Sequence, residues 1–153
     1  DHAYDSVVFI TYDVNLGWLI RGMHHWAANL MVITVGLHML RVFYHAAYKP
    51  LKELNWITGV FLLVLVLAFA FTGYLLPWDQ TAYWATMVGT SVLGTVPVIG
   101  DFLLRVVRGG SELGAVALVR FFWAHTFLLP LVAAVTMGGH LLMVRRQGIR
   151  HPL

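Results

Sequence analysis

The sequence predicts an all-α fold, a bundle of transmembrane helices with three visible spans and a short amphipathic helical connection on one membrane face. Apolar residues make up 59% of the 153-residue chain and charged residues only 11%, too little charge to solvate an ordinary soluble domain. Three apolar segments are long enough to cross a bilayer core, which takes about 20 residues of helix. Because backbone amides inside lipid must all be paired, such segments favour helices. The length suits a single domain over residues 1–153.

The three spans are predicted at about residues 22–43, 55–77 and 121–144. The first lies between Arg21 and Arg41, with no Asp, Glu, Lys or Arg between them. The second includes the run VFLLVLVLAFAF, and the third contains Pro130. Membrane helices tolerate a proline better than soluble helices do, so we predict a kink at Pro130 and not a break.

The charges predict which membrane face each connection occupies. The 41–53 connection and the tail after the third span carry six Lys or Arg residues and one acid. The amino-terminal segment and the 79–120 connection carry four Arg residues against six acids. Because Lys and Arg are enriched in cytoplasmic loops, we place the first group on the negative side of the membrane (n-side) and the second on the positive side (p-side). The net charge of +3 follows this topology, and we expect no nucleic-acid partner.

The p-side connection, residues 79–120, is too long to be structureless. Apolar residues recur at helical spacing over 98–106, whereas Asp101, Arg105 and Arg108 lie off that stripe. We predict a short amphipathic helix at the membrane surface here, and a second one over residues 3–12.

Four histidines recur at matched depths in the first and third spans. His24 and His38 are 14 residues apart, about 21 Å of rise and about 40° short of four full turns, so one helix face carries both. His125 and His140 are 15 apart, about 22 Å of rise and about 60° past four turns. The two spans run in the same direction, so each level has two imidazoles. This arrangement suits two bis-histidine haems stacked across a bilayer.

Other readings of these histidines are weaker. A zinc site usually needs three or four ligands on one centre, and each level supplies only two. A single histidine could merely hydrogen-bond a neighbouring helix, but ionisable groups inside membranes are costly and usually functional. His25 points about 100° away from His24 and is interpreted as an interfacial residue. The chain has no cysteine, which excludes disulfides, zinc–thiolate sites, iron–sulfur clusters and thioether-linked haem within it.

Two glycines of the second span, Gly59 and Gly73, are also 14 residues apart and fall at the two histidine levels. A flat macrocycle wedged between helices needs positions without a side chain, and glycine provides them. Arg21 and Arg41 lie three residues outside the histidines of the first span, where they could pair with haem propionates. Both could instead only mark the ends of a helix.

Four segments resemble the amino-terminal part of cytochrome b, most closely its b6 branch. They are VNLGWLIRGMHHWAANLMVI, TGYLLPWDQTAYWA, VPVIGDFLLRVVRG and RFFWAHTFLLPLVAAVTMGGHLLMVRRQGI, and the likeness covers nearly the whole chain. The 15-residue histidine interval and PWDQ resemble the b6 branch, because the mitochondrial type has a 14-residue interval and a glycine in place of Asp79.

The resemblance implies two haems b as cofactors. The matched ligands are His24 and His125 for the p-side haem, and His38 and His140 for the n-side haem. The matched Gly59 and Gly73 would face the haems, and Arg21 and Arg41 would lie near propionates.

The resemblance also implies a subunit of a quinol–cytochrome c or plastocyanin oxidoreductase, not active alone. It would carry electrons from quinol oxidation on the p-side to quinone reduction on the n-side, where Arg145 is a candidate residue. Implied partners are a Rieske-type iron–sulfur protein, a carboxy-terminal cytochrome b half or subunit IV-like chain, a cytochrome c-type subunit and membrane lipid, in a dimeric complex.

One departure from the family is large. The family has a transmembrane helix before the segment where this sequence begins, and in b6 proteins that helix carries the cysteine that tethers an extra haem. Either the helix is missing from the sequence in hand, or another chain supplies it, or the bundle has three helices.

Two other functions stay open at this point. One is a dihaem b-type membrane anchor of another respiratory dehydrogenase or hydrogenase, which would share histidine pairs but lack PWDQ and VPVIG. The other is a membrane protein without redox function, such as a metal transporter or a structural anchor. The composition, rich in Ala, Val and Gly, favours a bacterial plasma membrane over a thylakoid.

Overall fold

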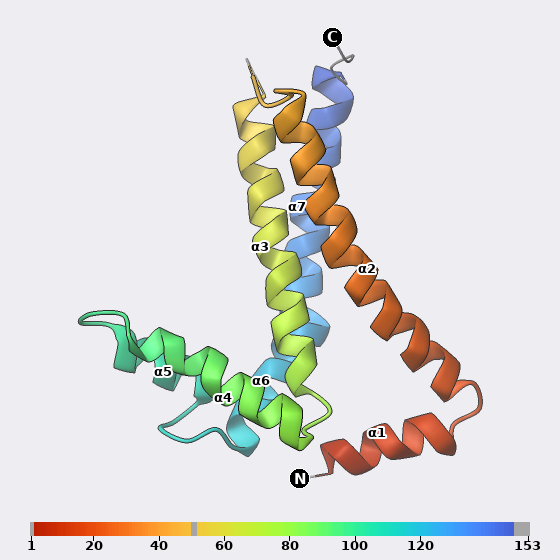
Figure 1. Ribbon diagram of the computed structural model, residues 1–153, viewed down its shortest axis with the longest axis vertical. Coiled ribbons are helices and arrows are strands. Elements are labelled where there is room, and N and C mark those ends of the chain that lie inside the picture. The colour runs from red at the N-terminus through yellow and green to blue at the C-terminus, as the bar shows by residue number, and fades with distance from the viewer. Residues whose placement is uncertain (1, 50–51, 149–153) are drawn as a thin grey trace.

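The computed structural model describes residues 2–49 and 52–148, and its regular elements there are all helices (Figure 1). Three are long and apolar enough to cross a membrane, which confirms the predicted fold class. They are α2 (Gly17–Tyr44), α3 (Glu53–Leu75) and the continuous helix Ala115–Gln147. The second span ends two residues earlier than the predicted 77, because residue 77 is a proline and disfavours helix in the residue before it.

The third span continues through Pro130 but changes its winding just before it. It consists of α6 (Ala115–Trp123), the π-helical turn η1 (Ala124–Leu128) and α7 (Leu129–Gln147). Proline has no N–H to donate to a carbonyl of the preceding turn, and membrane helices commonly meet this defect with a local π adjustment. The prediction that the proline does not break the helix is therefore confirmed, and the local distortion is a π turn.

Both surface helices predicted from the sequence are present. They are α1 (Ala3–Tyr12) and α5 (Gly100–Arg108), and both lie at the end of the bundle away from the connection between α2 and α3 (Figure 1). The tail of α7 lies at the opposite end, so the two groups of connections separate as the charge distribution predicted. The assignment of these ends to the p-side and the n-side stays a prediction.

A further helix, α4 (Gln80–Gly94), follows α3 directly and was not predicted. The side chain of Asp79 caps it by accepting a hydrogen bond from the Ala82 backbone N–H at 2.7 Å. An Asp that precedes a helix by one residue is a standard N-cap, so the PWDQ segment did carry a local signal for this element.

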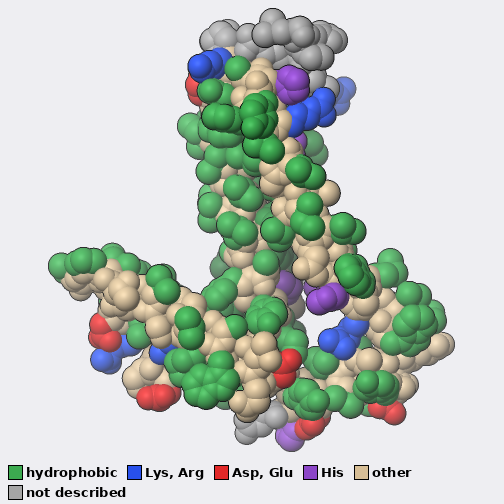
Figure 2. Space-filling model, in the orientation of Figure 1, with side chains coloured by type: hydrophobic (Ala, Val, Ile, Leu, Met, Phe, Trp, Pro, Cys, Tyr) green, Lys and Arg blue, Asp and Glu red, His purple; other side chains and the backbone are tan. Residues whose placement is uncertain are grey.

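Most large apolar side chains lie on the outside of the molecule. Figure 2 shows hydrophobic side chains along the long helices, with charged side chains gathered toward the two ends. The buried apolar residues within the described part of the chain are few: Leu62, Leu65, Leu75, Ala82, Leu113, Ala117 and Phe121. A soluble protein rarely exposes so much contiguous apolar surface, whereas lipid and neighbouring subunits cover it in a membrane protein.

Arg108 anchors α5 to α4 from a buried position, with only 5% of its surface exposed. Its Nε donates to the Thr90 hydroxyl at 2.8 Å, and its Nη2 donates to the Met87 carbonyl at 2.8 Å and to the Ser91 hydroxyl at 2.9 Å. Hydrogen bonds to a charged group contribute more than neutral ones, so this residue holds α5 against α4.

Replacing Arg108 by alanine should therefore destabilise this end of the bundle. We expect Arg108→Ala to lower the free energy of unfolding by at least about 2 kcal/mol, because three charge-assisted hydrogen bonds are lost. Thermal denaturation of the purified protein in detergent measures the change. The matched control is Arg105→Ala, because Arg105 forms an exposed i,i+4 ion pair with Asp101 that should contribute about 0.5 kcal/mol or less. Equal effects of the two substitutions would contradict this role.

Candidate functional site

The rings of His24 on α2 and His125 on η1 lie edge to face. Their centroids are 6.1 Å apart and their planes are inclined by 79°. Two metal–imidazole bonds of about 2 Å each, plus about 1 Å from each nitrogen to its ring centre, span about 6 Å. The separation of the two rings is therefore the one that a single metal ion held between two imidazoles would require.

The other two predicted ligands line a common cavity near the opposite end of the bundle. His38 and His140 border a space of about 290 Å³ together with Gly59 and Arg41. Lys52 closes this end by donating a hydrogen bond to the Gly148 carbonyl at 2.7 Å. The structure therefore places the four predicted histidines as two pairs at two depths, one pair in ring contact and one pair around a cavity.

The π turn explains how two unequal histidine intervals produce matching faces. In a regular helix, 15 residues end about 60° past four turns, whereas 14 residues end about 40° short of them. A π turn accommodates one extra residue in an α-helix. Because η1 lies at the start of the interval from His125 to His140, it takes up the additional residue. The two histidines are then in the same phase as His24 and His38.

Both predicted glycines lie directly against histidine rings of the third span. A Cβ added to Gly73 would lie 2.6 Å from Cε1 of His125, and one added to Gly59 would lie 3.3 Å from Cε1 of His140. The absence of a side chain thus makes room for the imidazoles in this structure. Contact of the same glycines with a macrocycle stays a prediction.

Threonines next to these glycines contact the same rings and were missed in the sequence analysis. The Thr72 hydroxyl lies 3.1 Å from Nδ1 of His125, and the Thr58 hydroxyl lies 3.1 Å from Nδ1 of His140. The available signal was the Thr-Gly dipeptide, which occurs at 58–59 and again at 72–73.

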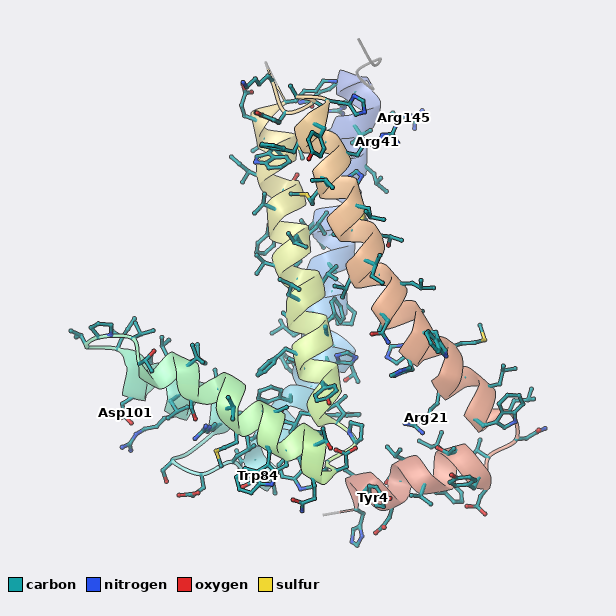
Figure 3. All side chains as sticks on the ribbon, in the orientation of Figure 1. Tyr4, Arg21, Arg41, Trp84, Asp101 and Arg145 are labelled. Atoms are coloured by element: carbon teal, nitrogen blue, oxygen red, sulfur yellow. The ribbon has the colours of Figure 1, made fainter. Side chains whose placement is uncertain are left out.

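The predicted arginines occupy the two ends of the bundle. Figure 3 shows Arg41 and Arg145 at one end of the bundle and Arg21 beside α1 at the other. Arg21 donates a hydrogen bond to the Thr11 hydroxyl at 2.6 Å and so ties α2 to α1. Within residues 2–49 and 52–148, no cluster of three or more His, Cys, Asp or Glu side chains could hold a metal by itself. The two histidine pairs therefore suit a metal group, such as haem, that supplies its remaining ligands itself.

Fold and site together define an integral membrane protein with paired imidazoles at two depths, an arrangement suited to haem. The family described as Cytochrome b/b6/petB matches residues 1–148. The chain belongs to this cytochrome b family, which implies haem b and a part in membrane electron transport.

Individual relatives agree with this assignment. The chain is 48% identical to cytochrome b6 of Synechococcus sp. (strain JA-3-3Ab) and 50% identical to cytochrome b6 of Mesostigma viride, covering 99% of this chain and 70% of each relative. A solved structure titled "Hyperthermophilic respiratory Complex III" superposes with a TM-score of 0.91 at 34% identity. The match covers 99% of this chain and 41% of that one.

The glycine contacts predict a graded effect of alanine on haem retention. Gly73→Ala should lower the haem content, because the new Cβ would lie 2.6 Å from Cε1 of His125 and displace that ring. Gly59→Ala should have a smaller effect, since its contact is looser. Haem per purified chain, from absorbance, is the measurement. Gly138→Ala is the control, because no atom lies within 4 Å of its added Cβ. A loss in the control as large as that in Gly73→Ala would refute the contact model.

Proposed function

We propose that this chain is the electron-carrying cytochrome b subunit of a quinol oxidoreductase, with one haem b held by His24 and His125 and another by His38 and His140. The observation that carries the proposal is the 6.1 Å separation of the centroids of the His24 and His125 rings, which lie on two different spans. Family membership supports the choice of haem over other metal groups.

The role of the protein is to hold two sites at a fixed separation in an apolar medium. Haem, when bound, supplies one-electron redox chemistry, which axial ligands, burial and nearby charge tune. The 14-residue interval on α2 separates the two levels by about 21 Å along the helix. With both imidazoles of a level bound to its haem, no coordination position would remain open, so oxygen binding is not expected.

Positive side chains border the cavity at the Arg41 end of the bundle. Arg41 and Lys52 line it together with His38 and His140. Arg145 lies in the last turn of α7 at the same end. Such residues suit anionic propionates, and Arg145 suits a quinone that is being reduced. By the excess of Lys and Arg, this end is the n-side.

The proposal requires partners, because the chain has no cysteine with which to hold an iron–sulfur cluster. The partners that fit are a Rieske-type iron–sulfur protein, a carboxy-terminal cytochrome b half or subunit IV-like chain, and a cytochrome c-type subunit, in a dimeric complex. Membrane lipid would cover the exposed apolar faces of the spans. Composition favours a bacterial plasma membrane.

Haem content tests the function directly. In the complex purified from membranes, the reduced protein should show a b-type α band equivalent to two haems per chain. His38→Ala should remove one haem and leave the other at least partly in place, because the pairs lie at different depths. His25→Ala is the matched control and should retain both, since its ring lies beside Trp26 and outside the pairs. The absence of haem from the unaltered protein would refute the proposal.

A further inference from the structure

The α3 helix carries the same two-residue unit at both histidine levels. Thr58–Gly59 contacts His140, and Thr72–Gly73 contacts His125. In both units the glycine leaves space beside Cε1 of the ring, and the threonine hydroxyl lies 3.1 Å from Nδ1. One helix therefore fixes the rings of both histidines that the third span provides.

The direction of these hydrogen bonds follows from the number of protons available. The Thr72 hydroxyl donates to the Ala68 carbonyl at 2.7 Å, and the Thr58 hydroxyl donates to the Asn55 carbonyl at 2.9 Å. A hydroxyl has a single proton, so its oxygen can only accept from the ring. With the hydroxyl proton engaged by a carbonyl, these contacts favour the tautomer in which Nδ1 of each histidine carries the proton and Nε2 carries the lone pair that a metal ligand needs.

The two histidines of α2 have no equivalent support. Within residues 2–49 and 52–148, no side-chain hydrogen bond reaches the ring of His24 or His38, and both residues are exposed. His125 and His140 are half-buried. At each level, one imidazole ring is thus oriented by a threonine of α3. The other ring has no such contact, and its orientation depends on α2 alone.

We propose that Thr58 and Thr72 are positioning residues that select the Nδ1–H tautomer of His140 and His125 and tune the potential of the haem at each level separately. This inference rests on the proposed haem ligation. A hydrogen bond from Nδ1–H to an acceptor makes Nε2 a stronger donor. Stronger donation stabilises ferric haem over ferrous haem, so the two hydroxyls lower the midpoint potential of their own level.

The test is an equilibrium redox titration of the α band in the complete complex, with two substitutions at each threonine. Valine keeps the shape of threonine and removes the hydroxyl, whereas serine keeps the hydroxyl and removes the methyl group. Thr58→Val should raise the midpoint potential of one haem and leave the other unchanged. Thr72→Val should raise the potential of the other haem. Both serine variants should titrate like the unaltered protein.

Thr34→Val is the matched control for loss of a hydroxyl inside a membrane span. Thr34 makes the same kind of bond to its own helix, to the Leu30 carbonyl at 2.8 Å, and no described contact joins it to a histidine. Its removal should leave both potentials unchanged. A shift in this control equal to that of Thr58→Val would overturn the inference.

The remaining outcomes separate this inference from the proposed function. If the unaltered complex holds two haems and both valine variants titrate normally, the inference fails while the function stands. If serine shifts a potential as far as valine does, packing and not the hydroxyl is responsible, and the inference fails. If a valine variant loses the haem of its level, retention in the serine variant supports the inference, and loss in both overturns it.

Discussion

The structure depends on the need to satisfy polar imidazoles inside an apolar bundle. A histidine in a membrane span is costly unless a neighbour takes up its hydrogen-bonding capacity. On the third span the neighbours are the hydroxyls of Thr58 and Thr72, whose own protons are used by carbonyls of α3. With Nδ1 occupied in this way, Nε2 is the atom left without a partner. The same contact would thus meet both the folding requirement and the requirement of the proposed haem ligand.

Helical phase is the second constraint. Two histidines of one helix can face the same side of the bundle at two depths only if the residues between them complete a nearly whole number of turns. On α2 a regular 14-residue interval achieves this. On the third span the interval is one residue longer, and the π turn at Ala124–Leu128 compensates. Pro130 lies just beyond that turn. A proline that interrupts helical hydrogen bonding is thus associated with the π turn that brings the two histidines onto one face.

Much of this could be predicted from the sequence because the informative signals are periodic. Apolar runs and apolar spacing predicted the three spans, α1 and α5, and the 14- and 15-residue intervals predicted the histidine pairs. The α4 helix was missed because its apolar and polar residues are mixed and its Asp79 cap is a single residue. Thr58 and Thr72 were missed for a different reason. A threonine in a membrane helix usually bonds only to its own backbone, and sequence alone does not reveal which neighbouring ring its oxygen also meets.

The repeated unit on α3 also fixes the size of the segment that joins its two copies. Adding or deleting one residue between Gly59 and Thr72 would rotate one copy by about 100° relative to the other and carry it away from its ring. The side chains of that segment can vary as long as they remain apolar, but their number cannot. The geometry of the site therefore constrains the length of this segment more strongly than its composition.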